Sequence, residues 1–441
     1  MRNNEVAPEL NPAALGLTMA EKILGAKAGT RLRAGEVGIC RVDAVMVHDS
    51  NAPTVLDAWE RLGCRLGLDP ARIVFVADHY APPPHALGAN AHRRMREFAH
   101  RYGVVFSEVG GGICHQVMLE SGLVKPGSLV VGSDSHSCTY GAFNAFGTGL
   151  GASEIAVVMA FGLTWFRVPA SIRVILTSAG GGFSPAVGGK DLALYLLGAL
   201  GTRGALYRAL EFGGPALPLI AWEERVTVAN MGVEAGAKAS IWEADSRVSG
   251  SGESQVRPDP GASYEHEITV DLDRLVPYVA LDDRVDVIRP VGEVVGTPVQ
   301  QVLIGSCTNG RASDFRTAAT ILRGRRVHSG TRLFLCPASR QVMAEITADG
   351  TAHDLICAGG SFLTPGCGPC AGYHAGIPAD GEVVLSTTNR NFKGRMGNPL
   401  AKVILASPAT AAASALAGHV ADPREYLPDS RPEMRERGGR V

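Results

Sequence analysis

Three cysteines in two short motifs carry the strongest chemical signal in this sequence. Cys307 lies in the run Ile304-Gly-Ser-Cys-Thr-Asn309, and Cys367 and Cys370 lie about sixty residues downstream in Pro365-Gly-Cys-Gly-Pro-Cys370. A cubane iron–sulfur cluster needs four thiolates to be fully capped, so three thiolates in one pocket leave one iron open to a substrate oxygen. Such an iron is a Lewis acid as well as an electron carrier. The two motifs together therefore predict a cluster that takes part in substrate chemistry.

The pair Cys367-Gly-Pro-Cys370 is also compatible with other chemistry. It has the letters of the thioredoxin dithiol, which lies early in a domain of about a hundred residues, between the first strand and a helix. Here the motif follows a Gly- and Pro-rich loop, and no second Cys-x-x-Cys or His-x-x-His pair at zinc-ribbon or zinc-finger spacing accompanies it. The thiol-oxidoreductase and zinc interpretations are therefore disfavoured relative to a cluster.

Cysteine usage as a whole favours a reducing compartment. Nine cysteines at irregular spacing suit a few ligand thiols better than a disulfide framework. Cys336 and Cys357 lie in apolar runs and are predicted to be core residues, because free cysteine packs like a small hydrophobic side chain. Cys114 and Cys138 each neighbour a candidate site histidine, and their roles stay open.

Two Asp–His pairs supply candidate acid–base groups. His79 follows Asp78, and His136 follows Asp134 by two residues. A carboxylate beside an imidazole fixes its tautomer and raises its pKa, as a general acid requires, although an isolated pair is usually structural. His115 adds a third imidazole in a Gly-rich segment. A second group of histidines is predicted to be structural: His85, His92, His100, His266, His328, His353, His374 and His419.

Two arginines after a predicted strand form a candidate carboxylate site. Arg390 and Arg395 flank a tight turn in the run Asn389-Arg-Asn-Phe-Lys-Gly-Arg395. The planar guanidinium group matches a carboxylate with two parallel hydrogen bonds. Paired arginines beside a metal cofactor therefore suggest a di- or tricarboxylic acid as the substrate, whereas the same motif alone would fit a surface loop.

The elements that must position these groups are short β-branched strands followed by helix-like sequence, a pattern of α/β layers with largely parallel strands. Several strands lead directly into the polar groups Asp78-His79, Asp134-Ser-His136, Ser306-Cys-Thr-Asn309 and Asn389-Arg-Asn391. The carboxyl ends of parallel strands are where open α/β sheets bind ligands, so the four groups are predicted to meet in one cleft. The predicted strands are 72–76, 128–131, 301–304, 332–335, 382–385 and 402–405.

The length and composition of the chain indicate how many domains it has and which classes of function it can have. The chain has 441 residues, which is more than one hydrophobic core supports, and three domains are predicted at 1–170, 171–290 and 291–441. A formal net charge of −1 and 19% charged residues argue against a nucleic-acid or membrane-surface role. No secretion signal or membrane-spanning segment is expected, which favours a cytoplasmic protein.

The motifs resemble the aconitase superfamily, in particular the two-subunit branch of 3-isopropylmalate dehydratase and homoaconitase large subunits. The resemblance implies three α/β/α layered domains with mainly parallel sheets packed around a central iron–sulfur cleft, without a swivel domain. It extends from about residue 18 to 425 and rests on these runs: Asp78-His79, His115-Gln116, Gly132-Ser-Asp-Ser-His136, Asn230-Met-Gly-Val-Glu-Ala-Gly-Ala237, Gly305-Ser-Cys-Thr-Asn309, Pro365-Gly-Cys-Gly-Pro-Cys370 and Asn389-Arg-Asn-Phe-x-Gly-Arg395.

The resemblance implies a 4Fe-4S cluster held by Cys307, Cys367 and Cys370, with the fourth iron binding the hydroxyl and one carboxylate of the substrate. It makes Asp78 and His79 the acid pair that protonates the departing hydroxyl. The implied reaction isomerises a 2-hydroxy to a 3-hydroxy acid by dehydration and rehydration, as in leucine biosynthesis.

Further roles follow from the resemblance for the Asp-Ser-His segment. Asp134 is expected to hydrogen-bond the iron-bound oxygen, and Ser135 a substrate carboxylate. His136 is expected to pair with Glu234, while His115 orders the pocket.

The resemblance also implies roles for residues of the Asn389–Arg395 motif. Asn389 is expected close to the cluster, and Arg390 and Arg395 on substrate carboxylate. His48 occupies the place of a family substrate contact in a looser motif.

The resemblance also implies a partner. Single-chain aconitases have a swivelling domain with the serine base and another substrate-binding arginine, and this chain is expected to obtain these from a separate small subunit. Ser137, Ser153-Glu154 and Asp282 depart from the usual family pattern and leave the substrate open. The alternatives are homoaconitase, citramalate or dimethylmalate dehydratase, and a specialised malate-analogue isomerase. From a different class, a cluster-free RNA-binding regulator is disfavoured by the near-neutral charge.

Overall fold

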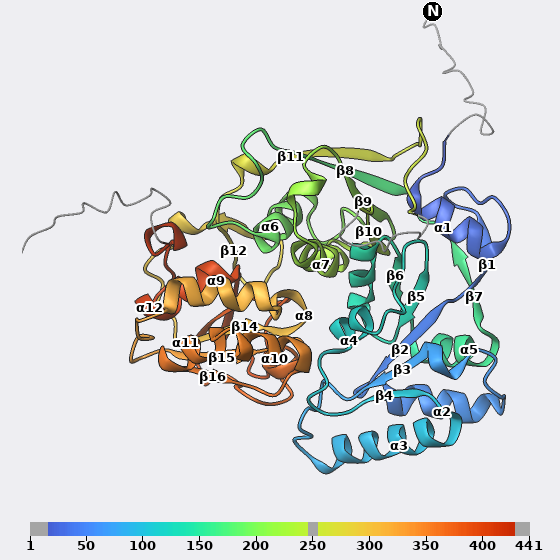
Figure 1. The fold of residues 1–441 in the computed structure, drawn as a ribbon, viewed down its shortest axis with the longest axis horizontal. Helices are drawn as coiled ribbons and strands as arrows, with labels where there is room; N and C mark the ends of the chain where they lie inside the picture. The colour runs from blue at the N-terminus through green and yellow to red at the C-terminus, as the bar shows by residue number, and fades with distance from the viewer. Residues whose placement is uncertain (1–15, 246–254, 428–441) are drawn as a thin grey trace, which may run out of the picture.

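The computed structural model describes residues 16–245 and 255–427, whose strands form four sheets (Figure 1). Among the described strands, antiparallel pairing is limited to β1 (Val37–Arg41) with β7 (Leu163–Arg167) and to β12 (Tyr278–Ala280) with its two neighbours. The predicted α/β class with mainly parallel sheets is confirmed. Within these residues, no helix has both the length and the apolar character that crossing a bilayer demands.

The N-terminal sheet has five parallel strands in the order β4-β3-β2-β5-β6. Its side chains alternate between two cores: Val45 and Val47 pack with α1, α2, α3 and α5, whereas Ala44 and Met46 face α4 and the centre of the molecule. The elements are α1 (Met19–Ala28), β2 (Ala44–His48), α2 (Ala52–Leu62), β3 (Ile73–Val76), α3 (Ala86–Tyr102), β4 (Val105–Ser107), α4 (Cys114–Glu120), β5 (Leu129–Gly132), β6 (Phe146–Gly149) and α5 (Ala152–Phe161).

The second sheet is parallel in the order β10-β9-β8-β11 and lies at the top of Figure 1. Its elements are β8 (Ser171–Thr177), α6 (Gly189–Leu200), β9 (Ala209–Gly213), α7 (Trp222–Met231), β10 (Ala239–Trp242) and β11 (His266–Asp271). A separate two-stranded ribbon joins β1 (Val37–Arg41) to β7 (Leu163–Arg167).

The third sheet has seven strands in the order β13-β12-β18-β17-β14-β15-β16. Val302 and Ile304 pack outward with α9 and α12, whereas Leu303 faces the molecular centre. Strands β12 and β13 belong to this sheet although they precede residue 291. The elements are β12 (Tyr278–Ala280), β13 (Ile288–Pro290), β14 (Gln301–Gly305), α8 (Ser306–Asn309), α9 (Ala312–Leu322), β15 (Arg332–Cys336), α10 (Arg340–Ala348), α11 (Thr351–Cys357), β16 (Gly360–Phe362), β17 (Val383–Ser386), β18 (Lys402–Ala406) and α12 (Pro408–Ala417).

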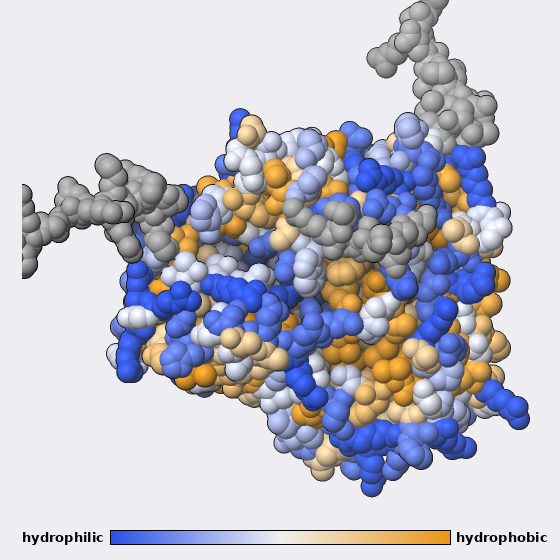
Figure 2. Space-filling view, in the orientation of Figure 1, coloured by the Kyte–Doolittle hydropathy of each residue, from blue (hydrophilic) through white to orange (hydrophobic). Residues whose placement is uncertain are grey.

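The inner faces of all three larger sheets share one central core. This core contains Met46 from the first sheet, Phe212 from the second and Leu303 from the third. The same cluster contains five buried cysteines: Cys114, Cys307, Cys336, Cys367 and Cys370. Hydrophilic residues cover α3 along the lower edge of Figure 2, and hydrophobic residues gather over the region of α4, β5 and β6. All six predicted strands form within one residue of their predicted ends.

Candidate active site

The cysteine motifs lie where the third sheet meets the N-terminal unit. Cys307 is in α8, directly after β14, while Cys367 and Cys370 lie in the loop after β16. The backbone N–H of Cys367 donates to the carbonyl of Asp78 at 3.0 Å, which joins this loop to the end of β3. All three cysteines are at most 5% exposed.

Asn389 connects the two cysteine motifs. Its side-chain nitrogen donates to the sulfur of Cys307 at 3.3 Å, and the thiol of Cys370 donates to its side-chain oxygen at 3.7 Å. The Nη2 of Arg395 donates to the sulfur of Cys370 at 3.4 Å. A hydrogen bond from Cys367 holds the pKa of Cys370 well below its ordinary value, and Arg395 acts in the same direction.

These residues fit an iron–sulfur cluster. Three thiols from two separate segments lie in one buried cluster, and all nine cysteines of the chain are free. N–H groups of Asn389 and Arg395 already point at their sulfurs, which is the outer-shell hydrogen bonding that tunes such clusters.

The candidate acid pair is buried at the end of β3. The Nδ1 of His79 lies 2.8 Å from Oδ1 of Asp78, whose other oxygen accepts from the backbone N–H of Cys114 at 2.8 Å. Burial would lower the pKa of His79, but the ion pair and hydrogen bond with Asp78 outweigh it and raise the pKa. The ring of His48 stacks on that of His79 at 4.2 Å between centroids. The pair is therefore arranged to hold a proton on His79.

Asp49 fixes the backbone of this acid pair. Its carboxylate accepts from the backbone N–H groups of His79 at 3.0 Å and Tyr80 at 2.9 Å, and from Nε2 of His92 at 2.8 Å. His374 donates from Nε2 to the carbonyl of His79 at 3.0 Å.

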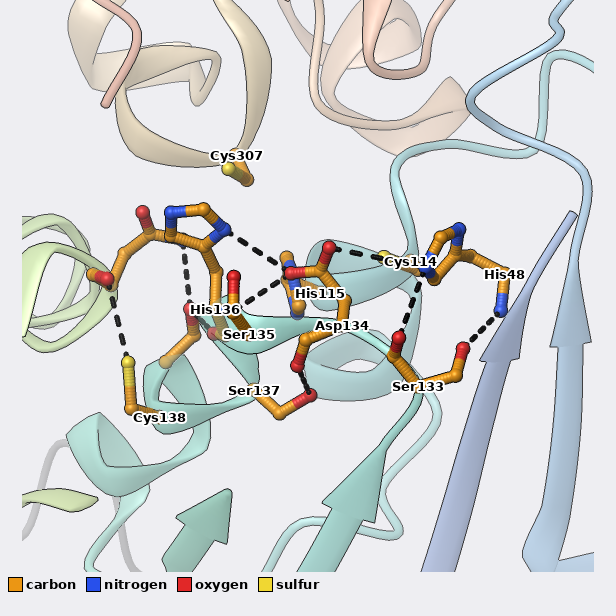
Figure 3. A network of polar contacts seen from close by, with 12 residues as sticks. His48, Cys114, His115, Ser133, Asp134, Ser135, His136, Ser137, Cys138 and Cys307 are labelled. Carbon is orange, nitrogen blue, oxygen red and sulfur yellow. Dashed lines mark hydrogen bonds and ion pairs between the residues drawn. The ribbon is translucent and has the colours of Figure 1, made fainter. Parts of the chain in front are cut away.

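Asp134 is the centre of a second network (Figure 3). Its Oδ1 lies 2.9 Å from Nε2 of His115 and 3.2 Å from Nδ1 of His136, and His136 continues through Nε2 to Glu234 at 2.8 Å. Burial would raise the pKa of Asp134, but hydrogen bonds from the two histidines hold it well below its ordinary value. Figure 3 shows Cys307 above the ring of His136, and Cys307 interacts electrostatically with Asp134, so this network lies near one of the three motif cysteines.

Arg390 links this network to the third sheet. Its Nε donates to Glu234 at 2.8 Å and its Nη2 donates to Ser135 at 3.1 Å. Ser135 is also next to a groove of about 370 Å³ whose wall includes Glu154 and Lys238. An anion bound near Ser135 would therefore meet a guanidinium group held in place by a carboxylate.

The structure brings together every site residue proposed from the sequence. Two acid–base networks, around Asp78 and Asp134, and the amide of Asn389 lie near the cysteines, and His48 lies between the two networks, 3.9 Å from Asp134. Ser133 supports His48 through its hydroxyl, which accepts from the backbone N–H at 3.1 Å.

Other neighbours of the site were not expected. His92 and His374, which were predicted to be structural, contact Asp49 and the backbone carbonyl of His79. The sequence could have indicated Asp49 as a site neighbour, because Asp49 directly follows β2 at a strand end. The two histidines have no such indication in the sequence, because their contacts join segments that are distant in the chain.

The two cysteines predicted to be core residues have different outcomes. Cys336 is fully buried, as predicted, and its thiol donates to the carbonyl of Gly366 at 3.3 Å in the loop of the cysteine pair. The prediction for Cys357 is wrong: it is exposed, because the helix that carries it turns this position outward, near His353.

Comparison with known proteins gives consistent matches along the chain. Residues 21–418 match the model of the aconitase family (aconitate hydratase). The chain is 47% identical over 421 residues to the 3-isopropylmalate dehydratase large subunit 2 of Archaeoglobus fulgidus, covering 94% of this chain and 100% of that protein. It is 47% identical over 423 residues to the homoaconitase large subunit of Thermus thermophilus, covering 93% and 98%. A 3-isopropylmalate dehydratase large subunit of Elusimicrobium minutum is 44% identical over 418 residues, covering 93% and 99%.

Proposed function

Because this chain belongs to the aconitase family, we propose that it is the cluster-bearing large subunit of a hydro-lyase that isomerises a 2-hydroxy to a 3-hydroxy acid, with 3-isopropylmalate dehydratase as the first assignment. The main support for the proposal is that the side chain of Asn389 forms hydrogen bonds with the sulfurs of both Cys307 and Cys370, next to two buried acid–base networks. Leucine biosynthesis is the corresponding pathway.

Cys307, Cys367 and Cys370 would hold the 4Fe-4S cluster that the family implies. When bound, the cluster supplies a Lewis-acidic iron for the hydroxyl and carboxylate of the substrate. Asn389 and Arg395 would donate hydrogen bonds to the ligand sulfurs.

His79 is the proposed proton donor to the departing hydroxyl. Its Nδ1 is engaged by Asp78, so Nε2 is the atom that carries the transferable proton. Asp49 keeps the backbone of His79 in place, which limits how far the imidazole can turn away from the substrate.

Asp134 and Arg390 are proposed to position the substrate. Asp134, held ionised between His115 and His136, accepts a hydrogen bond from the reacting oxygen. Arg390 and Ser135 bind a carboxylate, where positive charge favours removal of the neighbouring carbon-bound proton.

A separate small subunit is proposed to complete the site. The relatives are named large subunits, and this name implies a smaller companion. The companion is proposed to carry the swivel domain with the serine base, an additional arginine and the surface that recognises the malate substituent. We place the complex in the cytoplasm, where nine free thiols and an iron–sulfur cluster are stable.

Homoaconitase is the second candidate, because this chain is 47% identical both to the Thermus thermophilus homoaconitase large subunit and to the Archaeoglobus fulgidus 3-isopropylmalate dehydratase large subunit 2. Both candidates use the same chemistry on different substituents. Citramalate or dimethylmalate dehydratase and a specialised malate-analogue isomerase share it too.

The test is a substrate panel with the reconstituted complex. The chain and its small subunit are purified together without oxygen, loaded with iron and sulfide, and given isopropylmalate, homocitrate, citramalate, dimethylmalate and citrate. We expect the unsaturated acid to form from isopropylmalate first, and the rate of the chain alone to be about a hundredfold lower because the base is absent. A fully loaded complex that dehydrates none of these acids contradicts the proposal.

A further inference from the structure

Lys190 is a fully buried lysine that the site described above does not use. It lies at the start of α6, in the second unit, and its side chain has no solvent exposure. Its ammonium donates to the carbonyl of Thr387 at 2.7 Å and to the carbonyl of Thr388. Within the described part of the chain, both of its hydrogen-bond partners are backbone carbonyls, and it forms no ion pair.

The two carbonyls belong to the loop that holds the cluster cysteines together. Thr388 directly precedes Asn389, whose side chain contacts the sulfurs of Cys307 and Cys370. The carbonyl of Thr387 also accepts from the hydroxyl of Thr308 at 2.6 Å, and Thr308 is the neighbour of Cys307. Lys190 therefore lies behind both cysteine motifs, one layer of residues from the sulfurs.

A second buried cation supports the same backbone. Arg311 donates from Nη2 to the carbonyl of Cys307 at 2.7 Å and from Nη1 to that of Thr308 at 2.6 Å. The Arg311 side chain is buried, and the carboxylate of Asp314 accepts from its backbone N–H at 2.8 Å. Lys190 and Arg311 thus form a positively charged layer beneath the cysteine loops.

The carboxyl groups near Lys190 are engaged elsewhere. Asp191 accepts from the backbone N–H groups of Tyr278 at 2.9 Å and Gly188 at 3.0 Å, and Glu224 accepts from that of Gly189. Burial raises the pKa of Asp191 and of Glu224 to about 7, which weakens both as counter-ions. Burial lowers the pKa of Lys190 to about 7, and the charges of Cys307 and Cys370 oppose that shift. Once they bind iron as thiolates, the sulfurs would therefore supply the counter-charge that an isolated buried ammonium requires.

We propose that Lys190 is a positioning residue that places a positive charge beneath the iron–sulfur cluster and stabilises its reduced state, an inference that rests on the proposed function. Reduction adds one negative charge to the cluster. A cation in the low-dielectric interior lowers the free energy of that more negative state. The same two hydrogen bonds keep the Asn389 loop against the sulfurs.

The experiment compares reduction midpoints of the cluster in the anaerobically reconstituted full chain. Lys190→Met removes the charge at similar length, which matters because Lys190 lines a cavity of about 50 Å³ that would admit water beside a shorter side chain. Lys190→Arg keeps the charge. Thr308→Val is the matched control, since it removes a neutral donor to the same Thr387 carbonyl. Midpoints are followed by electron paramagnetic resonance during redox titration.

We expect Lys190→Met to reduce the reduced-to-oxidised ratio at fixed potential by about tenfold, which is about 59 mV toward negative potentials for one electron. Lys190→Arg and Thr308→Val should shift the ratio by less than about threefold. An unchanged midpoint in Lys190→Met, or an equal shift in Thr308→Val, overturns the proposal.

A second neutral variant, Lys190→Gln, is tested in case the Lys190→Met chain does not bind a cluster. Lys190→Gln keeps hydrogen-bonding capacity without charge and should show the same fall in midpoint. If both neutral variants lose iron while Lys190→Arg and Thr308→Val keep it, the need for charge is supported; loss of iron in Lys190→Arg as well overturns it. A wild-type chain that binds no cluster contradicts the proposed function itself, whereas a loaded cluster with an unshifted midpoint contradicts only the role of Lys190.

Discussion

At His79, burial and ion pairing act on the imidazole proton in opposite directions. Transfer from water disfavours the charged ring, but Asp78 at 2.8 Å favours it, and the pKa of His79 is raised. A general acid must be protonated before the reaction, so this arrangement suits the role proposed for His79 above the ordinary titration range of histidine. Activity that needs this proton falls only as the pH rises through the raised pKa.

The Asp78→Asn variant tests whether the charge of Asp78 raises the pKa of His79. The variant removes the negative charge and leaves burial, so the pKa of His79 should fall and the basic limb of the kcat profile should move about one unit or more to lower pH. The measurement is the pH dependence of dehydration by the reconstituted complex. His79→Asn is the companion variant: it should lower kcat by about a hundredfold or more. An Asp78→Asn profile with the same basic limb as wild type contradicts the assignment.

The cysteines allow a second test at the level of single residues. Serine at 307, 367 or 370 should weaken retention of the cluster by about tenfold or more, because a hydroxyl is a poor replacement for a thiolate ligand. Iron and sulfide per chain and visible absorbance after anaerobic reconstitution report the outcome. Cys336→Ser is the matched control, since Cys336 is equally buried in the same core. A cluster lost in Cys336→Ser but kept in Cys307→Ser would assign the ligands differently.

Among the elements, the turn from β14 into α8 aims Cys307 at the cleft. Gly305 has a φ of 147°, and Ser306 follows with a φ of 68°. A Cβ on Gly305 would lie 2.2 Å from the carbonyl oxygen of Cys336, so the end of β14 approaches β15 too closely for any side chain. The position of the Cys307 thiol, a proposed cluster ligand, thus depends on a glycine two residues before it.

Gly305→Ala should therefore destabilise the chain by about 1–3 kcal/mol and impair cluster loading. Gly292→Ala is the control, because nothing lies within 4 Å of a Cβ at Gly292, and it should change stability by no more than about 0.5 kcal/mol. Apparent thermal midpoints of the two apo variants, followed by circular dichroism, give the comparison. Equal midpoints would show that the turn tolerates a side chain.

For the molecule as a whole, the site is held by contacts between units distant in sequence. Cys367 bonds to the carbonyl of Asp78, Arg390 bonds to Glu234, and Lys190 bonds to the loop before Asn389. The inner faces of the three larger sheets share one apolar core around these contacts. A cluster bound in this core should stabilise the entire chain, because it binds the folded state alone.

Removal of the cluster should accordingly lower the thermal midpoint by several degrees, since about 1 kcal/mol already shifts a midpoint by roughly 2–4 °C in chains of moderate size. Anaerobic calorimetry before and after chelation measures the change. The Cys307→Ser variant treated in the same way should show a smaller change, because it retains less cluster. A wild-type midpoint that does not respond to chelation would mean that the cluster is not part of the folded core.

The sequence by itself determined the local features of this protein. Strand positions followed from β-branched runs, and the polar groups after Val76, Ile304 and Leu385 identified the strand ends that line the cleft. The cysteine motifs, the Asp–His pairs and the family resemblance also depend on short runs of residues. These signals lie within a few positions of one another, so no tertiary contact is needed to detect them.

Only the tertiary structure decided which distant groups act together. It joined His92 to Asp49, His374 to the backbone of His79 and Lys190 to Thr387, and it left Cys357 exposed. None of these outcomes has a periodic or motif signal, because each depends on how separate helices and loops pack around the shared core. The proposed ligand and acid–base residues were therefore visible in the sequence, whereas the buried cations and the hydrogen bonds that support these residues came from packing.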